Sequence, residues 1–134
     1  MTTHISETNK RIVLDAYASL KAGDVSGYLG AMSDDVTVTY YGNHFFTGTY
    51  NGLADIMENY VPALLNVLDG PIKITVSNAI AEGDQVFVEA KGESRTKDGR
   101  DYNNQYGIVL KLKDGKIKTI REYMDTELTK AIFG

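Results

Sequence analysis

The sequence contains no cysteine and no tryptophan, and only two histidines and two prolines among 134 residues. Without cysteine the chain has no disulfide framework, no thiol nucleophile, no zinc–thiolate site and no iron–sulfur site. His4 and His44 lie too far apart to form the His-x-x-x-His spacing that places two imidazoles on one helical turn. We therefore expect no metal and no bound cofactor, and chemistry carried by carboxylates, phenols, amides, a lone histidine or a borrowed cofactor.

Long apolar runs and an excess of positive charge are also missing. No apolar stretch approaches the roughly 18 residues of a membrane span, and Met1–His4 does not resemble a signal peptide. Acidic residues outnumber basic ones by 18 to 14, which argues against a nucleic-acid or anionic membrane partner. Hydrophobic residues make up 43% of the chain, enough for one core. We expect a cytoplasmic protein with a single domain over residues 1–134.

The first half of the chain has helical periodicity around one strand. Residues 5–22 predict an amphipathic helix, and Asp24 can cap a short second helix that reaches Met32. Residues 36–40 alternate as a strand does, and residues 42–52 are polar and glycine-rich, which predicts a loop. A third helix is expected over residues 53–68, with a kink or break near Asn59–Tyr60 caused by Pro62.

The second half has the pattern of a β-meander. Four alternating runs begin near residues 72, 86, 102 and 117, and turn sequences separate them at residues 82–84, 97–100 and 113–116. Asp-Gly pairs between alternating runs favour tight antiparallel hairpins. Residues 126–133 predict a short closing helix. Helices followed by strands indicate an α+β fold with a curved antiparallel sheet and helices on one face.

Strand alternation predicts which residues face the helices. They are Val36, Val38, Tyr40, Val86, Val88, Ala90, Gly92, Asn104, Tyr106, Ile108, Leu110, Ile120, Glu122 and Met124. Most are apolar, as a core requires, but Tyr40, Asn104, Tyr106 and Glu122 interrupt the pattern near one end. A carboxylate among aliphatic side chains is unfavourable unless it is paired, hydrated or protonated. The cluster therefore indicates a pocket.

Two other interpretations of Glu122 stay open at this point. A one-residue bulge would exchange the two sheet faces and place Glu122 in solvent beside Arg121. Glu122 could equally be a structural anchor that pairs with a residue of the first helix. Tyr17 lies on the apolar side of that helix, where an ordinary core tyrosine also belongs. His44 lies in the predicted loop, where a solvated turn residue is the default.

The other sheet face is mixed, with more aromatic residues than a solvated face normally has. Its residues are Thr37, Thr39, Tyr41, Phe87, Glu89, Asn103, Gln105, Val109, Thr119, Arg121 and Tyr123. A homodimer that packs sheet against sheet would account for this composition.

Several short motifs occur in an order that resembles a known family. They are Ala22-Gly23-Asp24, Ser33-Asp34-Asp35-Val36, Gly48-Thr49-Tyr50-Asn51-Gly52, Tyr102-Asn103-Asn104-Gln105-Tyr106, Asp114-Gly115-Lys116-Ile117 and Arg121-Glu122-Tyr123-Met124-Asp125-Thr126. Together they resemble the SnoaL-like branch of the nuclear-transport-factor-like superfamily, which includes ketosteroid isomerases and limonene epoxide hydrolases. The resemblance implies a cone-shaped α+β barrel in which a curved sheet and three N-terminal helices enclose an apolar pocket. It also implies a dimer through the outer sheet face.

The resemblance assigns roles to individual residues. Tyr17 matches the tyrosine that donates a hydrogen bond to the oxyanion in ketosteroid isomerases, whereas the aspartate base of those enzymes aligns with Tyr40. Glu122 matches one acid of the limonene epoxide hydrolases, whose remaining acid and arginine align with Gly92 and Ala90. SnoaL-like cyclases deprotonate an activated carbon with an acid or a histidine of the pocket, roles that Glu122 and His44 could fill.

Two hypotheses for function follow from these residues. In the first, the protein is a general acid–base cyclase, isomerase or hydratase for an apolar, carbonyl-bearing molecule, with Glu122 and Tyr17 as catalytic residues. Substrate contacts are then expected from Tyr40, His44, Val88, Asn104 and Tyr106. In the second, the same pocket holds an apolar ligand without catalysis. A protein-docking module that uses the outer face is a further alternative.

Overall fold

Helices come first along the chain and strands last, as the periodicity predicts. The computed structural model describes residues 2–134. Its helices are α1 (Thr2–Lys21), α2 (Val25–Gly30), α3 (Gly52–Asp55), the π-helical turn η1 (Ile56–Tyr60), α4 (Val61–Val67) and α5 (Thr126–Phe133). Its strands are β1 (Met32–Tyr40), β2 (Gly48–Asn51), β3 (Lys73–Glu82), β4 (Gln85–Glu93), β5 (Gln105–Lys113) and β6 (Lys116–Met124).

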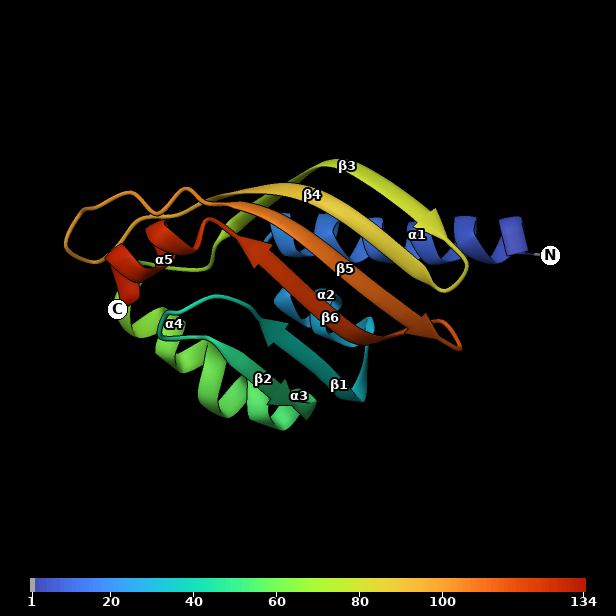
Figure 1. Ribbon diagram of the computed structural model, residues 1–134, viewed down its shortest axis with the longest axis horizontal. Coiled ribbons are helices and arrows are strands. Elements are labelled where there is room, and N and C mark those ends of the chain that lie inside the picture. Colours follow the sequence, from blue (N-terminus) through green and yellow to red (C-terminus); the bar gives the residue numbers. More distant parts are fainter. Residues whose placement is uncertain (1) are drawn as a thin grey trace.

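The strands form one curved sheet in the order β2-β1-β6-β5-β4-β3 (Figure 1). The α+β class, the curved sheet and the antiparallel meander β3–β6 are confirmed. The sheet is not closed into a barrel, since β2 and β3 are its two edges. It is also mixed rather than purely antiparallel, because β1 pairs with β6 in parallel. Alternation predicts the face that a side chain occupies, but it does not predict the direction of the neighbouring strand.

Strand β2 is the element that the sequence pattern missed. The predicted loop over residues 42–52 contains the four-residue strand Gly48–Asn51, which pairs antiparallel with β1. The segment Gly-Thr-Tyr-Asn has no apolar alternation, so its own composition does not indicate a strand. It becomes one because the free edge of β1 offers backbone hydrogen-bond partners.

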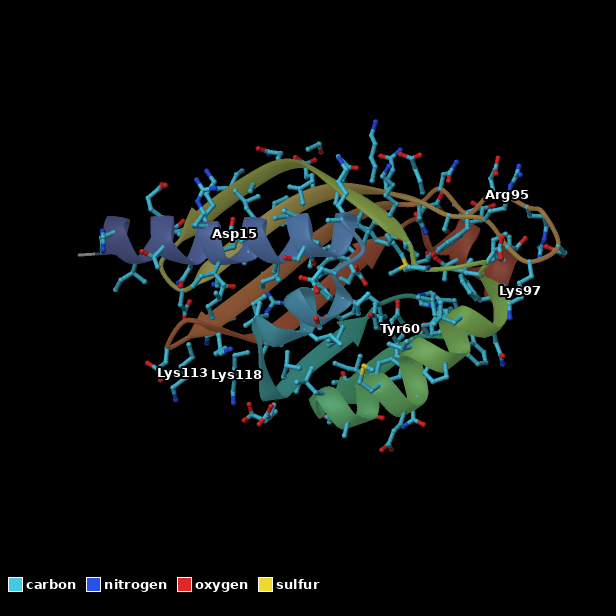
Figure 2. The ribbon with its side chains drawn as sticks, turned by 180° about the vertical axis from the view of Figure 1, so that it is seen from behind. Asp15, Tyr60, Arg95, Lys97, Lys113 and Lys118 are labelled. Atoms are coloured by element: carbon cyan, nitrogen blue, oxygen red, sulfur yellow. The ribbon has the colours of Figure 1, made fainter. Side chains whose placement is uncertain are left out.

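Local signals explain where the first two helices begin and end. Gly23 has φ +86°, a conformation typical of the residue that follows a helix, and it separates α1 from α2. The side chain of Asp24 accepts a hydrogen bond from the backbone N–H of Gly27 at 2.9 Å, as an N-cap residue does. Helix α1 packs across the inner face of β3 and β4. In Figure 2, which views the molecule from behind, α1 lies in front of the sheet and crosses its strands.

The predicted third helix is present as the consecutive segments α3, η1 and α4. Pro62 lies in the first turn of α4, directly after η1, and it has no N–H to donate to the preceding helical turn. The expected irregularity near Asn59–Tyr60 takes the form of the π-helical turn η1 rather than a break. Such turns insert an extra residue into a helix and are frequent at functional sites. Here η1 carries Tyr60 on the side that faces the rest of the molecule (Figure 2).

The hairpin between β5 and β6 has the predicted turn chemistry. Asp114 and Gly115 adopt φ values of +52° and +77°, which the two central residues of a type I′ turn require. The connection from β4 to β5 is longer than predicted. Strand β5 begins at Gln105 rather than Tyr102, because residues 94–104 form their own turn and contacts before the regular ladder starts.

The two sheet faces differ as the alternation predicts. Val86, Val88, Ile108 and Leu110 are fully enclosed on the inner face. On the outer face, the rings of Tyr41 and Tyr123 stack with centroids 4.7 Å apart, although the two residues are 39% and 46% exposed. The sheet-to-sheet homodimer stays a prediction. Within residues 2–134, no helix has the length and apolar character that crossing a bilayer requires.

Candidate active-site cavity

A cavity of about 270 Å³ lies between the inner face of the sheet and the helical segments α2, η1 and α4. This volume is close to the lower end of the range for small-molecule sites, about 300–1,000 Å³. Aliphatic residues from these helices and strands form most of the wall. The polar groups in the wall are those of Tyr28, Tyr40, Tyr60, Tyr102, Tyr106, Glu122 and Thr129. A site of this kind suits a small, mostly apolar ligand.

Glu122 lies in the cavity wall on strand β6. It pairs in register with Tyr40 of β1 on one side and with Ile108 of β5 on the other. The pairing of β5 with β6 is regular from Tyr106–Met124 to Lys111–Thr119, and its register shifts only between Lys111 and Leu112. This shift lies outside the segment that contains Glu122, so it does not move the Glu122 side chain to the other face of the sheet. The alternation Ile120, Glu122, Met124 therefore keeps the carboxylate on the inner face, where all three residues line the cavity.

The Glu122 carboxyl group is held in apolar surroundings. Among the described residues, no hydrogen bond or ion pair reaches this carboxyl group, and burial raises its pKa to about 7 from the ordinary value of 4.5. Desolvation disfavours the charged form, and no cation from residues 2–134 adds an opposing effect to the pKa of this group. At neutral pH the group is therefore divided between its acid and base forms, which is the condition that favours general acid–base catalysis.

Tyrosine residues from five different elements surround Glu122. They are Tyr17 of α1, Tyr28 of α2, Tyr40 of β1, Tyr60 of η1 and Tyr106 of β5. Burial raises the pKa of each phenol, and the charge of Glu122 adds to each increase. These phenols stay protonated throughout the neutral range, so they remain hydrogen-bond donors while Glu122 titrates.

The Tyr106 hydroxyl is enclosed at the cavity wall. Burial is the main cause of its raised pKa, and among the described residues it has no hydrogen-bond partner of acceptable geometry. The Tyr102 hydroxyl is close enough to contribute to that pKa, but it is held instead by Thr129 and Asn104. A buried donor without a partner is unfavourable, and a ligand or water that moves in to accept its proton would relieve that penalty.

Gly92 sets the position of the Tyr106 ring. A Cβ atom at Gly92 would lie 2.8 Å from Cε2 of Tyr106 and 2.9 Å from Cγ2 of Ile72. Both residues line the cavity. The absence of a side chain at this position therefore makes room for a tyrosine in the wall.

Replacing Gly92 by alanine tests this packing. We expect Gly92→Ala to lower the free energy of unfolding by about 1–3 kcal/mol, the usual range for an overpacked core site. The measurement is urea unfolding, with Gly107→Ala as the control, because a Cβ there would contact Phe87 at an ordinary 3.4 Å. Equal effects of the two substitutions would contradict a special role for Gly92.

Tyr17 and Val88 are buried beside the cavity rather than in its wall. Tyr17 is only 2% exposed and packs against Tyr28, with ring centroids 5.4 Å apart. It borders a smaller hollow between α1 and β3 instead of the main cavity. Val88 is fully enclosed in the core. Neighbouring side chains cover Val88 completely, so Val88 does not line the cavity where its substrate contact was predicted.

Asn104 is part of a buried hydrogen-bond network that holds helix α5 to the sheet. Its Nδ2 donates to the Tyr102 hydroxyl at 3.1 Å, to Oγ1 of Thr129 at 3.0 Å and to the backbone oxygen of Asp125 at 3.2 Å. Its Oδ1 accepts from the backbone N–H groups of Asp125 and Gln105. These partners use the whole amide, and Asn104 lies behind the residues that line the cavity.

His44 is likewise engaged within its own loop. Its Nδ1 accepts from the backbone N–H of Phe46 at 3.1 Å, and its Nε2 lies 3.0 Å from the backbone oxygen of Tyr41. A neutral imidazole that carries its proton on Nε2 satisfies both contacts. The side chain does not line the cavity, although the loop that it holds contributes Phe46 to the wall.

The structure adds Tyr28, Tyr60 and Tyr102 to the predicted set. Tyr60 lies on the apolar side of the predicted third helix, but a helical pattern alone does not separate a core tyrosine from one that borders a cavity. Tyr28 belongs to the six-residue helix α2, which is too short for a clear periodicity. Tyr102 precedes the regular part of β5. Of the predicted site residues, Tyr40, Tyr106 and Glu122 come together in the cavity wall.

Comparison with known proteins identifies the family. The sequence pattern of the SnoaL-like domain matches residues 13–120, well over half of the chain. The chain therefore belongs to the SnoaL-like family. No curated protein sequence matches it. Within the described residues, no group of three or more histidine, aspartate or glutamate side chains is placed to hold a metal ion.

Solved structures share the fold at low sequence identity. A protein of unknown function with a cystatin-like fold from Xanthomonas campestris is 24% identical, with a TM-score of 0.82 over 94% of this chain and 98% of that one. A Jannaschia protein described as a SnoaL-like polyketide cyclase is 17% identical, with a TM-score of 0.77 over 96% and 93%. TerC, crystallised with polyporic acid, is 25% identical, with a TM-score of 0.81 over 94% and 98%.

Proposed function

We propose that this protein is a general acid–base catalyst of the cyclase, isomerase or hydratase type for a small, apolar, carbonyl-bearing molecule. The observation that carries the proposal is Glu122, whose carboxyl group no described residue pairs with and whose pKa is about 7, in an apolar cavity lined by phenols. The Jannaschia neighbour described as a SnoaL-like polyketide cyclase supports this class of reaction.

In the proposed step, the Glu122 carboxylate removes a proton from the carbon next to the carbonyl group. The electron pair of that C–H bond moves toward the carbonyl oxygen, which gains negative charge. Tyr28, Tyr40 and Tyr60 line the same cavity as Glu122 and keep their protons, so their hydroxyls are the donors for this oxygen. Donors in a dry cavity stabilise a developing charge more strongly than water does. The protonated Glu122 then returns its proton to the product.

Hydrogen exchange in a model ketone tests this proposal without knowledge of the natural substrate. We expect the protein to accelerate the exchange of the methyl hydrogens of 2-acetylnaphthalene in D₂O, followed by NMR. The rate should rise with pH, reach half of its maximum at about pH 7 and level off above that pH, because only ionised Glu122 accepts a proton. Failure to accelerate exchange in 2-acetylnaphthalene or any other ketone shown to bind would contradict catalysis.

Ligand binding without catalysis is the second candidate. The wall of the cavity is mostly aliphatic and aromatic, which is sufficient to hold an apolar ligand. TerC, which was co-crystallised with polyporic acid, supports a small-molecule ligand for this fold. Saturable binding of ketones with no exchange above the buffer rate would favour this function over the first.

A further inference from the structure

The cavity wall contains no positively charged side chain among the described residues. None of its lining residues is lysine, arginine or histidine, and Glu122 is the only carboxyl group among them. The nearest cation along β6, Arg121, pairs in register with Thr39 and Val109 on the outer face. An anionic group of a ligand would therefore meet no cation in this cavity, although desolvated anions in proteins are normally paired.

The groups that face Glu122 do not neutralise its charge. The titratable groups that face Glu122 from the surrounding helices and strands are five phenols, which all stay protonated in the neutral range: those of Tyr17, Tyr28, Tyr40, Tyr60 and Tyr106. The other neighbour in register, Ile108, is apolar. When Glu122 is ionised, its negative charge is therefore directed at the ligand space, where the low dielectric strengthens repulsion between like charges.

We infer that the cavity selects its ligand by charge: it accepts an uncharged ketone, rejects a carboxylate of the same shape, and Glu122 makes the distinction. This inference rests on the proposed function only in placing the ligand in this cavity, and it requires no catalysis. It assigns the natural ligand to the uncharged members of the apolar carbonyl compounds and disfavours carboxylates and phosphates, increasingly so as Glu122 ionises.

The charge selection has a pH signature. A carboxylate ligand can enter only beside protonated Glu122, so its apparent affinity follows the protonated fraction of that residue. We expect this affinity to fall by about fivefold between pH 7 and pH 8 and by about tenfold between pH 8 and pH 9. The affinity for an uncharged ketone should change by less than about threefold over the same range, since no charge is brought near Glu122.

Two naphthalene derivatives of nearly the same shape test the inference. 2-Acetylnaphthalene carries a methyl ketone, and 2-naphthoate carries a carboxylate that is ionised throughout the range. Their dissociation constants are measured by fluorescence titration at pH 6, 7, 8 and 9 for the wild type and for Glu122→Gln. The matched control is Glu89→Gln, which removes an exposed carboxylate from the opposite face of the same sheet.

In the wild type and in Glu89→Gln we expect the ketone to bind at least tenfold more tightly than naphthoate at pH 8. In Glu122→Gln the affinity for naphthoate should rise by about tenfold at pH 8 and lose its dependence on pH. Equal binding of the two probes by the wild type at pH 8 would overturn the inference. So would a pH dependence that persists in Glu122→Gln, or the binding of neither probe. Charge selection without hydrogen exchange would contradict only the catalytic proposal, whereas exchange without charge selection would contradict only this inference.

Discussion

The Glu122→Gln variant is expected to lose about 10²–10⁴-fold of the hydrogen-exchange rate, the usual effect of removing a general base. Glutamine has nearly the shape of glutamate but cannot accept the proton at neutral pH. The cavity and its tyrosine donors stay in place, so ketone binding should be retained. A rate within about threefold of the wild type for a ketone that binds would show that Glu122 is not the base.

The same variant is expected to be more stable than the wild type at pH 8, by about 2–3 kcal/mol. Folding raises the pKa of Glu122 from 4.5 to about 7, so the folded state binds the proton more tightly than the unfolded chain does. The stability of the wild type therefore falls as pH rises from about 4.5 to 7 and then levels off. Glutamine, which carries no charge, avoids this loss.

Urea unfolding at pH 4.5 and pH 8 separates this effect from a general change in packing. The advantage of Glu122→Gln should be small at pH 4.5, where the wild-type carboxyl group is protonated in the folded state, and large at pH 8. Glu89→Gln, which removes an exposed carboxylate from the outer face of the same sheet, is the control for the loss of a charge. An equal advantage at both pH values would mean that the Glu122 charge is not destabilising.

Replacing Asn104 by leucine is expected to lower the free energy of unfolding by about 2–5 kcal/mol. The substitution removes the acceptor for two backbone N–H groups, those of Gln105 and Asp125. Both hydrogen bonds are partly buried, and a buried group left without a partner costs about 1–3 kcal/mol. It also releases the contacts that join Tyr102 and Thr129 to the sheet.

The effect of Asn104→Leu should concentrate at helix α5. Phe133 of α5 packs against Phe46 and Tyr102, which border the cavity, so a loosened α5 would open that end. Amide hydrogen exchange should show the largest loss of protection in residues 126–133. The control is Asn103→Leu, since Asn103 is exposed and makes one hydrogen bond of 3.3 Å, to Ser94. A loss below about 1 kcal/mol, or a uniform change in protection, would contradict the role of Asn104 in holding α5.

Most of the fold could be predicted because its elements carry local signals. The Asp-Gly turn at 114–115 and the alternation around Val86 and Ile108 specify the hairpins and their inner face. The strand β2 and the parallel pairing of β1 with β6 carry no such signal. They depend on which strand edge is free once the meander has formed, and this is a property of the whole sheet.

Part of the candidate site could likewise be predicted from local sequence patterns, and part depends on contacts between distant elements. Alternation along β6 predicts that Glu122 faces inward, because a residue of a strand has only two faces available. Asn104 also faces inward, yet its amide is fully engaged with Thr129, Tyr102 and Asp125, which lie elsewhere in the chain. A pattern of faces does not reveal whether a polar side chain has a partner from another element.

The absence of cysteine by itself excluded disulfides, thiol nucleophiles and zinc–thiolate or iron–sulfur sites, and it left carboxylates, phenols, amides and a lone histidine as the candidate groups. Local periodicity also determined that one carboxylate and several tyrosines lie on the same side of the sheet. Only the tertiary structure decided which of these groups meet in a cavity, since Tyr28 and Tyr60 come from helices whose packing brings them to Glu122. It also decided that Glu122 lacks an ionic partner among the described residues, and that condition raises its pKa to about 7.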